Sequence, residues 1–561
     1  MFKTDEQVAL LFVAKREKFL HIVSGDKLIA VKTRMAQKMK KLPISIQDFE
    51  RLITDDCVYV DKTPYIYKMA SEGMFYFLSR PRRFGKSLLV STLEHLFRGN
   101  KELFKGLWIE KADWDWKPHP VVLIDFSGIT SRTPEKLDEG LLLTLKKVAQ
   151  NYKIRLSSKL LAESFKEVII GLNQQCAERV VILIDEYDKP LINHLGKGEK
   201  ALEIAKQNRE VLREFYGVLK ESNVNKALRF VFLTGISKFA KMSIFSELNN
   251  LDDISMQEPY GAILGYTDEE LERYFKAHIK QFAAHLNRPE TEVSQQIQIW
   301  YNGYRFSDAE TKVYNPFSVL KLLKQNKFQD YWFETATPAF LVNLIKEQQY
   351  FIPQLEMLEL SQSDFTVYDL DNLKLEPLLF QTGYITIKDY DGDLYRLSYP
   401  NQEVKTSWLK FLYDQLVPIP DSSLKSQFKK LHTYLRQEQL ELFIETANAI
   451  LAAIPYPHLK KRDEHFYHTV FYLMLSASGA LAPTEVLTAR GRVDMEVYFP
   501  ERIYVVELKC NQSAQRAIAQ IKAKKYFEKH LHTGKKISLL GINFSTKEKR
   551  ITDWRVEEVE Q

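Results

Sequence analysis

The 561-residue sequence is poor in three features that would each assign it to a particular class of protein. It has only three cysteines, Cys57, Cys176 and Cys510, and they show neither CxxC nor Cys/His spacing. This scatter argues against a disulfide framework and against a zinc cluster. Low-complexity tracts are missing, and 45% hydrophobic with 27% charged residues is typical of an ordinary folded protein rather than a disordered one.

Long hydrophobic runs are missing near the N-terminus as well. The longest there, VALLFV, is far short of the roughly 20 residues that a membrane-spanning helix needs. The acidic start MFKTDEQ is wrong for the positively charged region of a secretory signal. We therefore expect a cytoplasmic protein without a membrane partner. The formal net charge of +6 is mild for this length, so it permits contact with nucleic acid without requiring it.

The length predicts several domains, because single hydrophobic cores stop growing well below this size. Residues 1–38 differ from the rest of the chain, and residue 39 opens MKKLPISIQDFERLI, which has the look of a natural start. We expect 1–38 to be an N-terminal extension or the product of a misassigned start codon. Residues 39–259 alternate β-rich runs with helical patterns, residues 260–455 are mainly helical, and residues 456–561 alternate again.

These patterns predict an α/β fold class for the two ends of the chain. In the first part MFYFL, PVVLIDF, VVILIDEYD and RFVFLTG are separated by crossover-length segments, which indicates a parallel sheet with helices on both faces. In the middle, YITIKDY and LYRLSY flank Asp391-Gly392, a strong hairpin signal between helical patterns, and this predicts a winged-helix-like region. The last part predicts helix, hairpin, helix and strand in a small α/β domain.

The stretch FYFLSRPRRFGKSLL has the context of a phosphate-binding loop, since a strand leads into it and a helix comes after it. Such a loop works because backbone N–H groups and the helix N-terminus converge on phosphate oxygens while a lysine adds positive charge. We therefore assign Gly85, Lys86 and Ser87 to nucleotide binding, with Ser87 also as a ligand of Mg²⁺. The alternative is a basic strand-to-helix turn without a catalytic role.

The loop departs from the full signature at its first position, where Arg80 replaces the usual glycine. A loop with one glycine fewer is stiffer. Arg82 and Arg83 could compensate, because guanidinium groups offer fork-like donors to phosphates. We therefore add both arginines to the predicted nucleotide-binding residues.

Carboxylates come directly after a later strand, where VILI runs into Asp185, Glu186, Tyr187 and Asp188. The end of a central parallel strand is where Mg²⁺ is held against a bound triphosphate. We predict Asp185 as a Mg²⁺ ligand beside the loop serine and Glu186 as the base that activates water. The next strand ends in Thr234, which could sense the γ-phosphate, although an ordinary strand-end turn fits equally well.

A second group of charged residues occupies GRVDMEVYFPERIYVVELK, near the C-terminus. If Pro500-Glu501 is the turn of a hairpin, Asp494 lies directly opposite Glu507, and Lys509 shares their face one pleat along. Two like charges in opposed positions are destabilising, and a divalent cation between them would remove the repulsion. We predict that Asp494 and Glu507 hold Mg²⁺, for which Mn²⁺ could substitute, with the Leu508 carbonyl, while Lys509 positions water or stabilises developing charge. A surface strand with an ordinary Glu/Lys pair is the alternative.

Six segments together resemble a known family. They are LPISIQDFERLITDDCVYVDKTPYIYKM, RPRRFGKSLL, LIDEYDKPL, LTGISKF, WYNGYRF and YNPFSVL. They closely resemble the bacterial AAA-ATPase-like family whose members carry a C-terminal PD-(D/E)XK nuclease-like domain, and the resemblance extends from about residue 39 to the end. It implies that RPRRFGKS is the family form of the loop, that ATP is the nucleotide, and that the carboxylates with the pattern D-x12-E-x-K belong to a nuclease-like site.

Several residues flank this second site. The resemblance implies that Gln520 is the glutamine that many nuclease domains of this type carry beside their catalytic residues. Glu464 and His468, at i and i+4 on the preceding helix, could reach the metal, and a capping or core role fits them as well. Residues 522–525 with Tyr526 would suit a phosphate backbone, although a solvated basic helix face is the more common explanation.

Three functions are compatible with these observations. The first is an ATP-binding, and we expect ATP-hydrolysing, protein coupled to a Mg²⁺-dependent nuclease that acts on DNA or RNA. The second is a nucleotide-switched protein that binds nucleic acid or a partner without cleaving. The third is a defence-related module with a protein or tRNA target. A homo-oligomer is compatible with each, and Arg305 in WYNGYRF could reach the phosphates or belong to an aromatic packing cluster.

Overall fold

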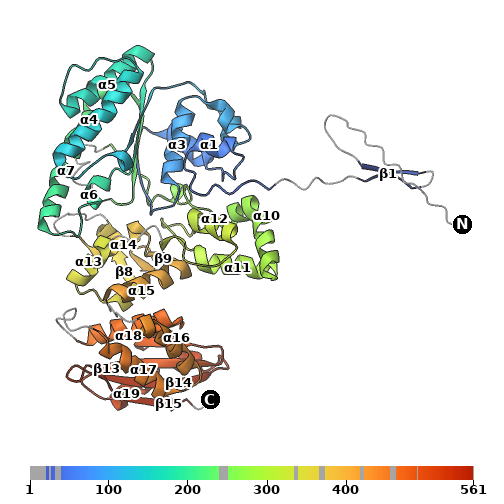
Figure 1. Cartoon of the computed structure of the whole chain (residues 1–561), viewed down its shortest axis with the longest axis vertical. Coiled ribbons are helices and arrows are strands. Elements are labelled where there is room, and N and C mark those ends of the chain that lie inside the picture. Colours follow the sequence, from blue (N-terminus) through green and yellow to red (C-terminus); the bar gives the residue numbers. More distant parts are fainter. Residues whose placement is uncertain are drawn as a thin grey trace.

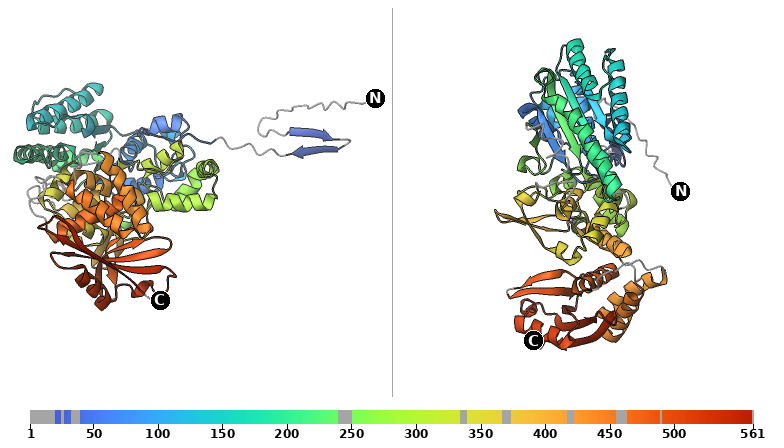
Figure 2. Two further views of the ribbon diagram at one scale, coloured as in Figure 1. Left: turned by 60° about the horizontal axis from the view of Figure 1, so that its bottom comes forward. Right: turned by 90° about the vertical axis from the view of Figure 1, so that its left-hand side faces the viewer.

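The structure is a computed structural model, and three parts of it lie one below another along the longest axis of the molecule (Figures 1 and 2). The residues it describes are 20–24, 27–31, 39–238, 250–333, 339–365, 373–416, 422–454, 463–488 and 490–559. The strands β1 (Leu20–Ser24) and β2 (Lys27–Val31) pair as an antiparallel hairpin. The rest of the expected extension 1–38 lies outside the described residues.

The first part is built on a parallel sheet in the order β4-β5-β6-β3-β7. Its strands are β3 (Phe75–Ser79), β4 (Val121–Asp125), β5 (Val180–Asp185), β6 (Leu228–Gly235) and β7 (Asp252–Asp253). The predicted parallel sheet is confirmed, and β7 is an additional edge strand that the sequence patterns did not indicate. Because β6 lies between β3 and β5, the phosphate loop and the carboxylates of the DEYD run flank the end of β6.

Helices cover both faces of this sheet (Figure 1). They are α1 (Phe49–Thr54), α2 (Thr63–Glu72), α3 (Lys86–Phe97), α4 (Pro134–Asn151), α5 (Leu161–Cys176), α6 (Lys189–Ile192), α7 (Glu199–Gly217) and α8 (Ser222–Ala227). Tyr76 and Leu78 of β3 pack in one apolar cluster with α1 and α3. Phe75 and Phe77 pack in another cluster with α4, α5 and α7. Alternate residues of a strand point to opposite faces of the sheet. A strand that is buried throughout therefore packs against the helices on both faces.

The middle part places a small sheet among helices. Its helices are α10 (Asp268–Leu286), α11 (Glu290–Tyr301), α12 (Pro316–Gln325), α13 (Ala339–Glu347), α14 (Leu375–Thr382) and α15 (Gln402–Leu416). The strands β8 (Leu358–Ser361), β9 (Thr386–Tyr390) and β10 (Leu394–Ser398) form an antiparallel sheet in the order β8-β10-β9. The predicted hairpin at Asp391-Gly392 is confirmed, with Gly392 at a φ of +101°.

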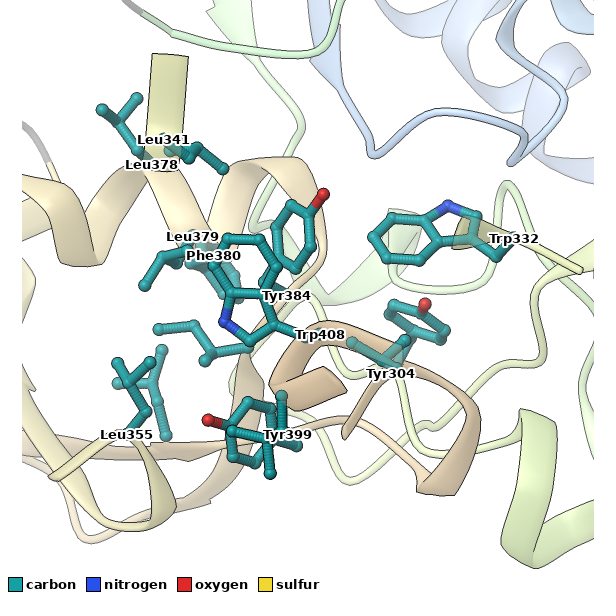
Figure 3. Close-up of a cluster of buried hydrophobic side chains, with 14 of the residues drawn as sticks. Tyr304, Trp332, Leu341, Leu355, Leu378, Leu379, Phe380, Tyr384, Tyr399 and Trp408 are labelled. Carbon is teal, nitrogen blue, oxygen red and sulfur yellow. The ribbon is translucent and has the colours of Figure 1, made fainter. Parts of the chain in front are cut away.

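Aromatic and leucine side chains form the core of this middle part (Figure 3). The rings of Tyr384 and Trp408 lie 4.2 Å apart, and Trp332 meets Tyr384 at 5.2 Å. The same apolar cluster includes Leu93 of the first part and Val506 of the last. The middle part therefore joins the two ends through continuous packing.

The C-terminal part is a second α/β unit. Its elements are α18 (Glu464–Ser478), β11 (Thr484–Thr488), β12 (Gly491–Tyr498), β13 (Arg502–Cys510), α19 (Ala514–Lys524), β14 (Lys536–Ser545) and β15 (Arg550–Glu558), and α16 (Ser422–Arg436) and α17 (Leu440–Ala452) pack against it. The sheet order is β11-β12-β13-β14-β15, with β13 and β14 parallel and the other neighbours antiparallel. The predicted helix, hairpin, helix and strand are confirmed, and β11 and β15 extend the sheet at its edges. The exact domain bounds 39–259, 260–455 and 456–561 stay a prediction.

Candidate nucleotide and metal sites

The phosphate loop runs from the end of β3 into the first turn of α3. Gly85, the residue before this helix, has a φ of +98°, a left-handed conformation that glycine adopts with little strain. Lys86 is buried, and its Nζ donates to the carbonyl oxygens of Arg80 and Pro81, each at 3.0 Å. Burial lowers the pKa of Lys86, while the charge of Asp185 acts in the opposite direction. A bound phosphate would therefore compete with carbonyls of the loop for the lysine ammonium.

The two predicted Mg²⁺ ligands of this site are in contact. Asp185 ends β5, is 5% exposed, and accepts a hydrogen bond from the Ser87 hydroxyl. Burial raises the pKa of Asp185, and the bond from Ser87 and the charge of Lys86 oppose that shift. A hydroxyl beside a carboxylate is a donor set that Mg²⁺ takes next to nucleotide phosphates, so these residues fit the ion.

Residues directly after β5 and β6 line the same region. Glu186 has a φ of +53°, faces the cavity, and lies 3.1 Å from Lys189 Nζ. Asp188 is 1% exposed, and its Oδ2 accepts from Ile236 N at 3.0 Å and from the backbone N and hydroxyl of Ser237, each at 2.7 Å. Asp188 therefore fixes the turn after β6, a role that sequence reasoning missed because the partners are about fifty residues away.

Thr234 lies deeper in the sheet. It is fully buried, and its hydroxyl donates to the Leu78 carbonyl of the neighbouring strand at 2.7 Å. It is not among the residues that line the cavity. Its role as a γ-phosphate sensor stays a prediction.

A cavity with a volume of about 530 Å³ adjoins the phosphate loop. This volume is within the usual range of ligand pockets. The phosphate loop and the residues after β5 form its polar side. Its apolar side comes from distant segments and consists of Ile46, Leu52, Val58, Tyr59, Val60, Ile263, Leu264, Tyr266, Pro316, Phe317 and Leu320. Sequence reasoning missed this wall, because no local pattern marks residues that converge from three separate segments.

The side chain of Arg80 points away from the cavity and is bonded to backbone carbonyls next to the phosphate loop. It is 1% exposed and donates to the carbonyls of Ser79 at 2.9 Å, Ser255 at 2.6 Å and Tyr260 at 3.1 Å. Its guanidinium lies 4.3 Å from the centre of the Phe306 ring. Burial lowers the pKa of Arg80 to about 9. The residue in the glycine position thus ties the phosphate loop to the segment that leads into the middle part.

The other arginines differ in position. Arg82 and Arg83 are exposed and line the cavity, and Arg83 lies over the Phe317 ring at 4.9 Å. Their contact with phosphate stays a prediction. Arg305 is buried in the middle part and donates to the Ser307, Asp308 and Lys388 carbonyls. It does not line the cavity.

The second site lies on the β12–β13 hairpin, whose predicted turn and register are confirmed. Phe499 N donates to the Arg502 carbonyl at 2.8 Å, which closes the turn around Pro500-Glu501. Met495 pairs with Val506, and the next position toward the open end places Asp494 opposite Glu507.

Glu507 of this hairpin is buried, and Asp494 is half-buried. Asp494 Oδ2 accepts from Leu508 N at 2.7 Å, and Glu507 Oε1 lies 2.8 Å from Lys509 Nζ. Glu507 is 1% exposed, and its Oε2 has no hydrogen-bond partner among the residues that the structure describes. Burial raises the pKa of both carboxyls, and the charge of Asp494 adds to the increase at Glu507. An orphaned carboxylate oxygen beside a second carboxylate fits a divalent cation.

Two further residues converge on Asp494. His468 of α18 places Nε2 3.7 Å from Asp494 Oδ2, and ligand atoms of His468, Glu485 and Asp494 all lie within 4.8 Å of one another. Burial lowers the pKa of His468 to about 4, so the imidazole is neutral near pH 7. Glu485 was missed from sequence. The pairing of Thr484 with Met495 and of Val486 with Val493 sets it opposite Asp494, and only recognition of β11 as a strand could have revealed this.

The predicted Gln520 approaches the site through a tyrosine. Tyr526 is 3% exposed and shares a side-chain hydrogen bond with Gln520. Burial raises the pKa of Tyr526, and the charges of Glu507 and Asp494 add to that effect. The role of Gln520 stays a prediction. Of the basic residues near the end of α19, Lys522 forms an ion pair with Glu557 and Lys525 forms one with Glu528. Glu464, at the start of α18, is exposed.

Comparison with known proteins gives matches to both ends of the chain. Residues 43–245 match the family described as predicted AAA-ATPase, and residues 462–554 match the PD-(D/E)XK nuclease superfamily. The chain is also 38% identical over 530 residues to an "uncharacterized protein in vnfD 5'region" of Azotobacter chroococcum mcd 1, which covers 92% of this chain and 99% of that protein. Among the described residues, we find no helix with both the length and the apolar character needed to cross a bilayer.

Proposed function

Because the chain belongs to the AAA-ATPase-like family with a C-terminal PD-(D/E)XK nuclease-like domain, we propose that it binds and hydrolyses ATP and cleaves phosphodiester bonds of DNA or RNA. We place the protein in the cytoplasm. One observation carries the nuclease proposal. Glu507 is buried opposite Asp494 and beside Lys509, and one of its oxygens has no hydrogen-bond partner in the part of the chain that the structure describes. Such an arrangement is destabilising in a purely structural hairpin and useful in a phosphodiesterase.

The residues of the hairpin have separable roles in this proposal. Asp494 and Glu507 would hold Mg²⁺ or Mn²⁺, and the bound ion would polarise the phosphate and lower the pKa of a water molecule. Lys509 can hold the attacking water or stabilise charge on the phosphate, because its ammonium already contacts Glu507. Gln520 would orient the substrate together with Tyr526, to which it is hydrogen-bonded.

In the first part, the cavity supports ATP as the nucleotide. Lys86 and the N-terminus of α3 supply positive charge for the phosphates, and Ser87 with Asp185 would hold Mg²⁺. Glu186 lies at the cavity with its carboxylate in reach of solvent, as a base that accepts a proton from water requires. The apolar wall contributed by Tyr266 and Phe317 is suited to a purine ring.

Contacts through the middle part support communication between the two sites. Trp332 donates its indole N–H to the Arg82 carbonyl of the phosphate loop at 3.2 Å, and its backbone N–H to Glu403 of α15 at 2.9 Å. α15 packs directly against α18, which carries His468. A change in the phosphate loop can therefore be transmitted by contiguous packing to the nuclease-like site.

Cleavage assays on plasmid, single-stranded DNA and RNA test the proposal, with Mg²⁺ or Mn²⁺ and with or without ATP. Wild type is compared with Lys86→Ala, Lys509→Ala and the control Lys105→Ala, an exposed lysine outside both candidate sites. We expect Lys509→Ala to lose cleavage while it still binds ATP, Lys86→Ala to lose the response to ATP, and the control to match wild type. Absence of cleavage by wild type, with ATP binding intact, would instead favour a nucleotide-switched protein that binds nucleic acid or a partner.

A further inference from the structure

We propose that Phe351 of the middle part and His465 of α18 form a stacking platform for an unpaired base beside the nuclease-like site, so that the site prefers single-stranded nucleic acid to duplex. The inference rests on the proposed function, because it takes nucleic acid as the substrate of the hairpin site. It goes further by naming the residues that hold a base and the form of substrate that they select.

Phe351 is held against the C-terminal part by the short 3-10 helix that follows it. The Pro353 carbonyl of this helix accepts a hydrogen bond from the Thr484 hydroxyl of β11 at 3.0 Å, and Glu356 accepts one from the Tyr472 hydroxyl of α18. α18 lies on the side of the C-terminal part that faces the middle part (Figure 1). The middle part therefore brings one aromatic side chain to the helix that covers the nuclease-like site.

The ring of Phe351 contacts two histidines of α18. Its centre lies 4.8 Å from that of the His465 ring and 6.1 Å from that of the His468 ring. His468 Nε2 in turn lies 3.7 Å from Asp494 Oδ2. Residues three apart on a helix are neighbours on its surface. The platform of Phe351 and His465 therefore lies one helical turn from the histidine that contacts Asp494.

The platform is accessible from solvent, unlike the residues next to it in the chain. Ile352, Pro353 and Leu355 are buried. Phe351 is half-buried and His465 is exposed. An aromatic pair that only joined two parts of a protein would be expected in the interior with its neighbours. A pair that remains partly accessible can accept a third flat ring, and stacking of a base on an aromatic side chain stabilises nucleic-acid complexes whatever the base.

Positive charge next to the platform suits the phosphates of a strand. Arg492 is exposed and precedes Asp494 by two residues on β12, so both side chains lie on the same face of the sheet. Burial raises the pKa of Glu485, and the charges of Arg492 and His465 oppose that shift. Both residues are thus close to Glu485, which has a carboxylate oxygen within 4.8 Å of a carboxylate oxygen of Asp494. A cation for a phosphate and a platform for a base border the same site.

The stacking geometry determines which form of nucleic acid can use the platform. In a duplex, neighbouring bases cover both faces of each base, so a base has no free face unless the enzyme extrudes it, which costs unpairing and unstacking free energy. In a single strand, an aromatic side chain can replace a neighbouring base at lower cost. The platform therefore favours single strands, loops and ends.

The test is binding of labelled oligonucleotides to the full chain with Lys509→Ala, the substitution expected to prevent cleavage. Fluorescence anisotropy gives the affinity for a single strand of about 12 nucleotides, for the same strand with an abasic position, and for the duplex. An aminopurine base in the single strand reports stacking, because its fluorescence falls when it stacks. The variants are Phe351→Leu, His465→Ala and Phe351→Tyr, which keeps the ring. Trp108→Leu is the matched control, since Trp108 is 47% exposed and lies in the first part, outside the cavity.

We expect Phe351→Leu to weaken binding of the single strand about tenfold, the loss of one stacked base, and to leave the duplex affinity nearly unchanged. His465→Ala should weaken binding of the single strand less. Phe351→Tyr and Trp108→Leu should match the Lys509→Ala parent in affinity and in the aminopurine signal. Circular dichroism and ATP binding verify that each variant is folded.

Two results would overturn the inference. Equal losses of affinity for single strand and duplex in Phe351→Leu would indicate that Phe351 only packs between the two parts. Unchanged affinity for the single strand in both Phe351→Leu and His465→Ala would exclude the platform, even if wild type cleaves nucleic acid. Binding of single strands that depends on Phe351, in a protein whose wild type cleaves nothing, would contradict the proposed nuclease and leave this inference standing.

Discussion

The candidate nucleotide site and the nuclease-like site differ in how completely their buried charged groups are hydrogen-bonded. Arg80 Nε of the phosphate loop lacks a partner among the described residues, but the other guanidinium nitrogens of Arg80 donate to three carbonyls. In the first, Lys86 is bonded to carbonyls of its own loop and Asp188 to groups after β6. In the second, Glu507 Oε2 and His468 Nε2 are buried without hydrogen-bond partners among the described residues. The difference teaches that Lys86 and Asp188 of the candidate nucleotide site also stabilise their domain, whereas the hairpin site contains buried polar atoms whose missing hydrogen bonds are unfavourable for folding.

Asp188→Ala should give the largest loss of stability, and it tests whether Asp188 of the candidate nucleotide site stabilises its domain. Removal of the carboxylate leaves two backbone N–H groups and a hydroxyl buried without an acceptor, so we expect a loss of about 3–5 kcal/mol and a fall in Tm of roughly 10 °C. Thermal unfolding of the full chain measures this, and Asp188→Asn, which retains one acceptor oxygen, should lose less. Equal Tm values for Asp188→Ala and wild type would break the comparison.

Arg80→Gly restores the glycine of the usual loop signature and should nevertheless be harmful. The substitution removes donors to three buried carbonyls and the contact with Phe306, which we expect to destabilise the domain by about 2–4 kcal/mol. ATP affinity, measured by calorimetry, should not improve, because the guanidinium lies beneath the loop. Tighter ATP binding with unchanged stability would show that Arg80 obstructs the site instead of supporting it.

Glu403→Gln tests the contact between α15 and the phosphate loop, which runs through Trp332. The test uses the dependence of stability on pH. Burial raises the pKa of Glu403 to about 8 in the folded protein, whereas an exposed carboxyl of the unfolded chain titrates near 4.5. Between these values the unfolded state has released a proton that the folded state keeps, so stability falls as pH rises through this window. Because glutamine does not titrate, the stability of the variant relative to wild type should rise by about 3 kcal/mol from pH 5 to pH 8. Thermal unfolding across this range measures it, and the exposed Glu347→Gln should show no such trend.

Glu507→Gln should have the smallest effect on stability, and it should stabilise the protein. Without added metal, the loss of a buried charge opposite Asp494 should stabilise the protein by about 1 kcal/mol. With Mn²⁺, wild type should gain stability and the variant should gain less, since binding to the folded state raises Tm. Thermal unfolding with and without Mn²⁺ gives both values. A destabilised variant without metal would mean that Glu507 serves the fold and would remove the contrast between the two sites.

Local patterns were sufficient to predict much of this molecule. The strand, loop and helix around Lys86 and the strand that ends in Asp185 result from apolar runs next to polar turns. The hairpin register that sets Asp494 opposite Glu507 follows from a two-residue turn and from the alternation of side chains between the two faces of a strand. Each of these features is determined by residues close to one another in the chain, which is why a single sequence reveals it.

The side chains that the sequence left open or did not reveal depend on distant partners. Arg80 was a departure from the usual loop signature, and its direction was decided by the carbonyls of Ser255 and Tyr260. His468 left a metal role and a core role equally open until its position beside Asp494 was known. Glu485 attracted no attention because β11 is a short edge strand without a strong pattern.

By itself, the sequence determined the α/β character of both ends and indicated two candidate sites, one around Gly85 to Ser87 with Asp185 and one on the hairpin of Asp494 and Glu507. Only the tertiary structure decided what surrounds them: the apolar wall of the cavity beside the phosphate loop, the inward bonding of Arg80, and the approach of His468 and Glu485 to Asp494. The physical reason is that turn chemistry and periodicity act over a few residues, whereas burial, hydrogen-bond satisfaction and ligand convergence depend on which segments pack together in space.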